Sequence, residues 1–149
     1  MDKHTVNIYP IGSQVYIGEF FQAFEFDCES DESENRFTLI APPLVIILDE
    51  IRRRVGRPIR IESGYRTFAW NKEIGGKEGS WHLRGMAADI WAPGMDINAL
   101  GMNASYLLDK GVEWMGNTYQ IGGYREYLTN NFIHLDVRPR KTDGGYTTW

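Results

Sequence analysis

The stretch Ser80–Asp89 reads SWHLRGMAAD, and the chain returns at Phe132–Val137 with FIHLDV. Together the two stretches contain two of the three histidines of the sequence. His82, Asp89 and the distant His134 can supply the three protein ligands of a catalytic zinc, leaving the fourth position for water. We therefore predict a catalytic metal site built from these two stretches.

Asp89 lies in the apolar segment Met86–Trp91, which we predict to be a buried strand. An unpaired carboxylate inside such a strand is costly or becomes protonated, so it requires a cation or hydrogen-bond donors. A metal ion meets this need, and so does a salt bridge to Arg66 or Arg84. His82 favours the metal, because the glycine-rich loop before it lets the chain bend back toward Asp89.

The second stretch is predicted to be a strand in which side chains alternate between two faces. His134 and Asp136 then share one face, at a separation of about 6.5 to 7 Å along the strand. From there Asp136 can reach a neighbouring ligand, a water or a substrate group, or it is a solvated or salt-bridged carboxylate. The opposite face, which we expect to pack inward, carries Ile133, Leu135 and Val137.

Length and composition describe an ordinary globular protein. The 149 residues predict a single domain, 1–149, in which the segment 1–40 wraps the core. The net charge of -4 gives no general attraction to nucleic acid. Apolar runs such as Leu44–Leu48 are far shorter than the roughly 20 residues of a membrane helix, so we expect no membrane insertion. Polar residues at positions 2–4 interrupt any signal-peptide pattern.

Two residues with metal-binding side chains are left out of the predicted site. Cys28 is the single cysteine, which excludes an internal disulfide framework and a cysteine-rich zinc site. His4 lies near the start of the chain, where a terminus is seldom anchored.

Local patterns predict a mixture of helices and antiparallel strands, an α+β class. Pro42 and Pro43 begin a helix that Gly56 ends. The predicted elements are a helix over 42–55, a strand over 59–62, a short helix over 68–74, a strand over 86–91, a helix through Ala99 and Leu108 that Lys110-Gly111 closes, and paired strands between 112 and 137.

The order and spacing of several motifs resemble the zinc peptidases of the D-alanyl-D-alanine carboxypeptidase type, and within them the small single-domain members. The resemblance covers most of the chain. It is carried by Phe24–Cys28, Pro58–Arg66, Asn71-Lys72, Gly75-Gly76, the signature Ser80–Asp89 and the closing strand Phe132–Arg138.

This resemblance implies an α+β fold shared with Hedgehog signalling domains, with a small antiparallel sheet and flanking helices. It implies zinc on the three ligands named above and peptidoglycan stem peptides as substrate. Arg66 then stabilises the oxyanion that develops on the scissile carbonyl, or is only a salt-bridge partner of Asp89. Ser80 hydrogen-bonds the substrate or orients its loop, or is only a cap.

One position departs from the wider family, whose members place a glutamate or aspartate three residues before the last histidine ligand as general base. Asn131 occupies that position here, and an amide cannot take the proton. Asn131 faces the metal only if the chain turns or bulges just before Phe132. Asp136 is the nearest carboxylate left, either to accept a proton or to hold His134 in its ligating tautomer.

The resemblance predicts a monomeric zinc metallopeptidase that hydrolyses stem peptides, as a D-Ala-D-Ala carboxypeptidase or an endolysin-type endopeptidase. With no signal peptide seen, such an enzyme is cytoplasmic until release, or virion-associated, and acts on the cell wall. The alternative is a catalytically inactive module of the same fold, which binds the cell wall or is a structural part of a virion. Asn131 supports the alternative, and so does the aromatic C-terminal segment 145–149.

Overall fold

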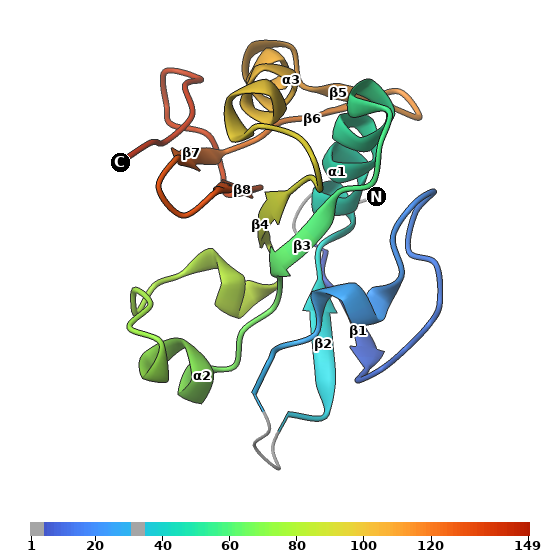
Figure 1. The fold of residues 1–149 in the computed structure, drawn as a ribbon, viewed down its shortest axis with the longest axis vertical. Coiled ribbons are helices and arrows are strands. Elements are labelled where there is room, and N and C mark those ends of the chain that lie inside the picture. Colours follow the sequence, from blue (N-terminus) through green and yellow to red (C-terminus); the bar gives the residue numbers. More distant parts are fainter. Residues whose placement is uncertain (1–4, 31–34) are drawn as a thin grey trace.

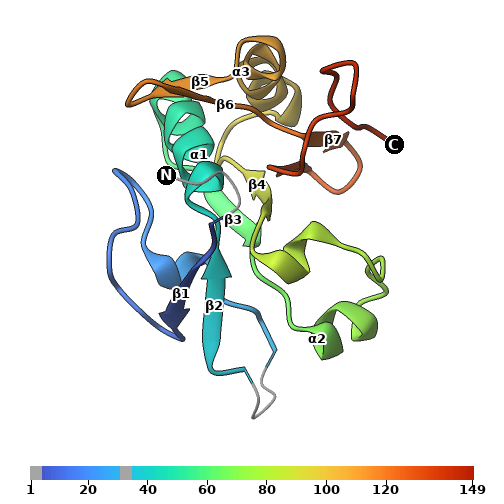
Figure 2. The same cartoon turned by 180° about the vertical axis from the view of Figure 1, so that it is seen from behind.

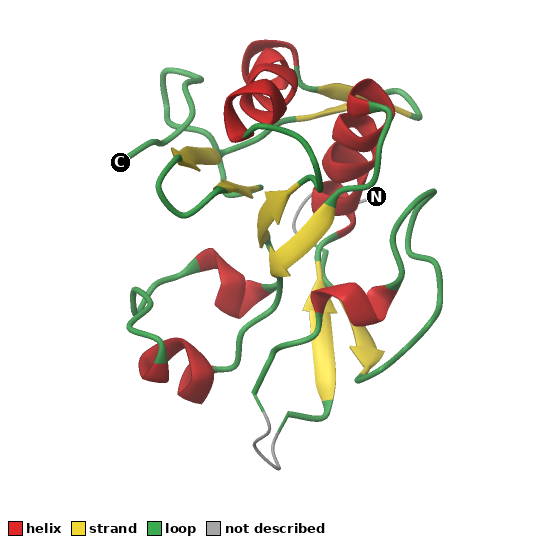
Figure 3. Cartoon of the chain, viewed as in Figure 1, coloured by secondary structure: helices red, strands yellow, loops and turns green. Residues whose placement is uncertain are grey.

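The computed structural model describes residues 5–30 and 35–149 and has an α+β architecture, as the sequence patterns predicted (Figures 1 and 3). His4 lies outside these residues. The helices are α1 (Pro42–Val55), α2 (Phe68–Glu73) and α3 (Ile97–Lys110), with two short 3-10 helices, η1 (Ala23–Phe26) and η2 (Trp81–Arg84). The strands are β1 (Asn7–Pro10), β2 (Phe37–Ile40), β3 (Arg60–Ser63), β4 (Ala87–Trp91), β5 (Val112–Trp114), β6 (Asn117–Tyr119), β7 (Gly123–Tyr127) and β8 (Phe132–Asp136).

The central sheet is antiparallel, with the strand order β3-β4-β8-β7. Its register pairs Asp89 on β4 directly with His134 on β8 and with Ser63 on β3. Directly opposite residues of an antiparallel pair have Cβ atoms about 4.5 to 5.5 Å apart. Strand pairing alone therefore brings Asp89 and His134 together from positions far apart in the sequence.

Two helices bury their apolar faces together with this sheet. Pro42 begins α1, and Gly56 ends it in the left-handed conformation with φ 70°. In α3, Asp96 caps the first turn by accepting the N–H of Asn98 at 2.6 Å. Figures 1 and 2 show α1, α3 and the β5–β6 hairpin grouped at one end of the molecule. The helix predicted over 42–55 is confirmed, and the one predicted through Ala99 and Leu108 ends at Lys110-Gly111 as predicted but begins earlier, at Ile97. Within residues 5–30 and 35–149, no helix is both long and apolar enough to span a membrane.

The N-terminal part of the chain adds a two-stranded sheet, β1–β2, that the sequence patterns did not predict. It also contributes buried Phe21, Ala23 and Phe26 to the hydrophobic core. Its connection to α1 is polar: Asp49 accepts the N–H groups of Glu19 at 2.9 Å and of Phe20 at 3.3 Å. Burial raises the pKa of Asp49 despite these two donors.

A glycine joins the predicted metal-binding loop to this N-terminal sheet. Gly85 ends η2 with φ 68°, and its carbonyl accepts the N–H of Ala41 at 2.8 Å. A Cβ at this position would collide with the backbone carbonyl of Leu39. The close approach of β2 to η2 therefore requires glycine here.

We predict that Gly85→Ala lowers the free energy of unfolding by about 3 kcal/mol or more, because the left-handed backbone and the collision with Leu39 both act against it. Gly94→Ala is the matched control, since Gly94 also has a positive φ of 73° but only an ordinary 3.6 Å contact with Arg57. It should cost only about 1 to 2 kcal/mol. Urea denaturation followed by circular dichroism measures both, and equal losses would contradict the packing argument.

Candidate metal centre

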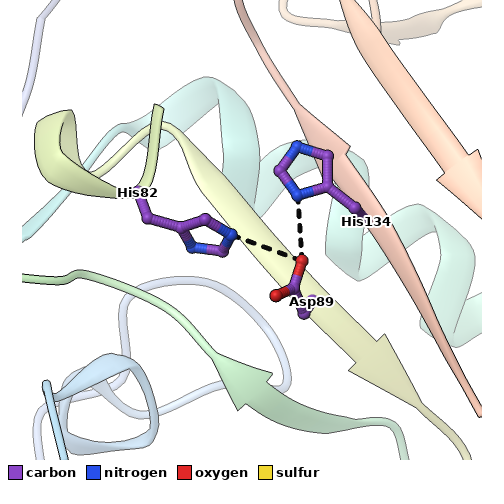
Figure 4. A group of neighbouring side chains, drawn as sticks. All are labelled: His82, Asp89 and His134. Carbon is purple, nitrogen blue, oxygen red and sulfur yellow. Dashed lines mark hydrogen bonds and ion pairs between the residues drawn. The ribbon is translucent and has the colours of Figure 1, made fainter. Parts of the chain in front are cut away.

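Three buried side chains converge at the centre of the molecule (Figure 4). His82 comes from η2, Asp89 from β4 and His134 from β8, and their ligand atoms all lie within 4.8 Å of one another. Asp89 Oδ1 is 3.3 Å from His82 Nε2 and 2.9 Å from His134 Nδ1. Two imidazoles and a carboxylate are the donor set that a catalytic zinc takes, with one position left open.

The surroundings of His82 leave one ring nitrogen free for a metal. His82 Nδ1 lies 2.7 Å from the carbonyl oxygen of Gly64, which can only accept a hydrogen bond, so Nδ1 carries the proton. Nε2 is buried and has no hydrogen-bond partner among the described atoms. A buried lone pair without a donor is the condition of a metal-ligating histidine. Gly64 is required at this point, since a Cβ would lie 2.8 Å from the backbone of Phe26.

The second histidine is oriented in the same way by a carboxylate. His134 Nε2 lies 2.9 Å from Asp136 Oδ2, while its other nitrogen, Nδ1, faces Asp89. Asp136 also accepts three hydrogen bonds from Arg138, two from its guanidinium at 2.8 Å and 2.6 Å and one from its backbone N–H at 3.1 Å. Burial by itself raises the pKa of Asp136, but Arg138 and His134 outweigh it and hold that pKa below its usual value. Asp136 is therefore an ionised acceptor for Nε2 of His134, and Nδ1 is the ring nitrogen directed at Asp89 and at a metal bound there.

The alternation of side chains along the predicted strand did not indicate that Asp136 is buried. Ile133 and Leu135 pack inward as predicted, but Asp136 on the opposite face is also fully buried. The reason is that β8 is an inner strand whose second face is covered. Arg138 and Trp149 lie over that face, and Trp149 packs edge-on against His134 at 5.1 Å.

The charge of Asp89 is stabilised on both of its oxygens. Burial by itself raises the pKa of Asp89, but the neighbouring imidazoles of His134 and His82 outweigh it and hold that pKa well below its usual value. Oδ2 is 3.2 Å from Arg66 Nη2, so the salt bridge exists beside the metal-binding cluster and does not replace it. Arg84, the other cation considered for Asp89, instead stacks on Trp81 at 4.6 Å.

Arg66 is held in a fixed orientation by neutral groups as well. Its Nε donates to Ser63 Oγ at 3.0 Å, and its Nη1 donates to Asn71 Oδ1 at 3.3 Å. Burial lowers the pKa of Arg66 from its ordinary value. Asn71 was a motif residue without an assigned role. Its amide connects Arg66 to the loop at Lys77, whose carbonyl it contacts at 2.8 Å.

These groups line an open cleft of about 640 Å³. Ser80 caps η2 by accepting the N–H of His82 at 3.3 Å, and its side chain is among the lining residues. The sequence did not predict that Tyr127 and Trp149 line the cleft, because nothing in their local sequence indicates that they meet the metal-binding stretches. The residues that line the cleft are Arg66, Ile74–Lys77, Gly79–His82, Asp89, Tyr127, Phe132, His134, Arg138, Thr147 and Trp149.

Asn131 does not line the cleft. It lies in the turn between β7 and β8 with φ 59°, and its side chain is exposed. The chain does turn just before Phe132, yet that turn leaves the amide at the surface. Among the described residues that line the cleft, Asp89 is the only carboxylate.

We predict that the purified protein binds one zinc ion and that His82→Ala and His134→Ala each lose it after mild chelation and dialysis, because each removes one of three ligands. Cys28→Ala is the matched control: the buried thiol lies beside Thr67, outside the cluster, and its loss should leave zinc unchanged. Elemental analysis measures the metal, and circular dichroism checks folding. Stoichiometric zinc in either folded histidine variant would contradict the ligand set.

Comparison with known proteins gives one result that bears on this centre. No curated protein matches the chain at a significant level. The sequence pattern of the family Peptidase M15 matches residues 19–136, which is more than half of the chain and includes all three residues of the cluster. The chain therefore belongs to the Peptidase M15 family, the zinc D-Ala-D-Ala carboxypeptidase-like peptidases, as its motifs indicated.

Proposed function

We propose that this protein is a zinc-dependent peptidase that hydrolyses peptide bonds in bacterial peptidoglycan stem peptides. The observation that carries the proposal is the pair of imidazoles that each direct one ring nitrogen at the same oxygen of Asp89, in a cleft large enough for a peptide. We propose also that the fold is of the Hedgehog/DD-peptidase type. The protein acts as a monomer on the cell wall, after release from the cytoplasm or as part of a virion.

In this proposal Arg66 and Ser80 have separate roles beside the zinc ion. Bound zinc supplies Lewis acidity, which lowers the pKa of water and polarises a carbonyl. The guanidinium of Arg66 is anchored by its hydrogen bonds to Ser63 and Asn71. It can therefore stabilise negative charge on the carbonyl oxygen of the scissile peptide bond without reorganising. Ser80 Oγ accepts the N–H of His82, which leaves its hydroxyl proton to hydrogen-bond the substrate.

Asp136 has the geometry of an orienting residue. It is fully buried, does not line the cleft, and contacts the ring nitrogen of His134 that points away from Asp89. We propose that it holds His134 in the tautomer that ligates through Nδ1 and makes that nitrogen a stronger donor. The alternative role, that of general base, requires access to water beside the metal.

A second candidate function is a zinc-containing module of the same fold that binds the cell wall, or is part of a virion, without catalysis. The absence of a second carboxylate from the described lining of the cleft favours it, as does the exposed side chain of Asn131. Zinc content is the same in both candidates. Mass spectrometry of muropeptides after incubation with zinc-loaded protein separates them and identifies the bond cut, since only an enzyme yields shortened peptides.

We predict that Arg66→Lys lowers kcat by about 100-fold or more with little change in zinc affinity, because lysine keeps the charge but loses the planar donor fork. Arg84→Lys is the control, because Arg84 is exposed and stacks on Trp81 away from Asp89. Steady-state kinetics on stem peptides measure the loss, and circular dichroism checks folding. An unfolded Arg66→Lys protein would show that the salt bridge is structural, and unchanged kcat would refute the catalytic role.

We predict that Asp136→Asn weakens zinc affinity by about 10- to 100-fold, because the amide holds the His134 tautomer less firmly. Asp49→Asn is the control: Asp49 is a buried carboxylate too, but it lies on α1, outside the cluster, so its replacement should leave zinc affinity unchanged. Competition with a chromogenic chelator gives the affinities. Normal zinc affinity with a turnover loss of about 100- to 10,000-fold would instead identify Asp136 as the base. Normal zinc affinity together with full activity would exclude Asp136 both as the orienting residue and as the general base.

A further inference from the structure

The C-terminal segment lies beyond the family match and folds back onto the metal centre. Thr147 donates its N–H to the carbonyl of Gly122 at 2.8 Å and accepts the N–H of Tyr124 at 3.0 Å. These two bonds add the segment in parallel to the edge strand β7, next to which the C-terminus lies in Figure 1. The residues that follow Thr147 are thereby carried into the cleft.

Trp149 ends this segment as a wall of the cleft. Its indole Nε1 donates to the hydroxyl of Tyr127 at 2.9 Å, and its ring packs edge-on against His134 at 71°. Two cations lie over the same indole: Arg138 at 5.2 Å and Lys77 at 5.4 Å from the ring centroid. The indole is therefore fixed by a hydrogen bond, a ring contact and two charges.

The cations that line the cleft differ in their partners. Arg66 pairs with Asp89, and Arg138 pairs with Asp136. Lys77 lines the same cleft and pairs with no carboxylate in the described part of the chain. Its backbone is held in place, because its carbonyl oxygen accepts from the Asn71 amide at 2.8 Å and from the N–H of Ser80 at 3.0 Å. Lys77 is thus an exposed cation on an anchored backbone, and the described partner of its ammonium is the face of the indole.

We propose that Lys77 and Trp149 form a subsite that binds a carboxylate of the peptide substrate and so determines specificity. The aromatic face attracts the ammonium and keeps it over the cleft. A carboxylate bound there would complete an ion pair with Lys77, the lining cation that has no carboxylate partner among the described residues. This inference rests on the proposed function, because it names the substrate feature that the cleft selects.

A stem peptide offers this chemistry in two places, its C-terminal carboxylate and the α-carboxylate of γ-linked D-Glu. Three synthetic pentapeptides separate them: L-Ala-γ-D-Glu-L-Lys-D-Ala-D-Ala, its C-terminal carboxamide, and the version with D-isoglutamine at the second position. For the wild-type protein we expect one of the two amides to lower kcat/KM by about 10-fold. The amide that does so identifies the carboxylate bound at the subsite.

Variants test whether Lys77 and Trp149 cause this discrimination. Lys77→Ala should lower kcat/KM about 10-fold for the unmodified peptide and leave the discriminating amide unchanged, so that the preference disappears. Lys72→Ala is the matched control, since Lys72 lies on α2 outside this cleft. Trp149→Phe should keep the preference and Trp149→Ala should lose it, with zinc content equal in all variants. A Lys77→Ala loss of equal size on all three peptides would overturn the proposal.

Calorimetric titration of the zinc-loaded proteins with the same peptides distinguishes this inference from the proposed function. A carboxylate preference in binding that Lys77→Ala abolishes, without hydrolysis of any peptide, would support the subsite and overturn the peptidase. Hydrolysis without any carboxylate preference, in binding or in turnover, would support the peptidase and overturn the subsite.

Discussion

The buried charge of Asp89 is the constraint on which the arrangement of this molecule depends. A carboxylate on an inner strand must be compensated from several directions. One oxygen faces two imidazoles, and the other faces the guanidinium of Arg66. The compensating groups come from β8, from η2 and from the segment that follows β3. The order of the sheet, the loop before η2 and the placement of Arg66 are thus linked through one side chain.

A second layer of contacts sets the direction of each ligand nitrogen. The carbonyl of Gly64 and the carboxylate of Asp136 each contact one nitrogen of an imidazole, so that the other nitrogen of each ring is directed at Asp89. Gly64 is itself packed against Phe26, whose carbonyl accepts the N–H of Tyr65 at 2.9 Å. The N-terminal segment therefore supports the metal centre as well as the core.

The cleft above this centre is cationic, and that property bears on both candidate functions. Asp89, the one carboxylate among its described lining residues, already contacts Arg66 and two imidazoles, whereas Lys77 pairs with no carboxylate of the described chain. An enzyme and a binding module would select an acidic peptide in the same way. They differ in whether a group beside the metal accepts a proton, which is why turnover separates them and metal content does not.

The sequence by itself determined the main helices and strands from Pro42 onward and the identity of the cluster, although not the β1–β2 sheet. Pro42 and Gly56 bound α1 through local backbone chemistry, and the apolar runs around Asp89 and His134 indicate strands through side-chain periodicity. Only the tertiary structure decided which imidazole nitrogens are directed at Asp89 and that the side chain of Asp136 is fully buried. It also decided that Asn71, Tyr127 and Trp149 belong to the site. Each of these depends on contacts between distant parts of the chain. Local propensity and periodicity act over a few residues, so they carry no information about which distant partner will satisfy a given nitrogen or cover a given face.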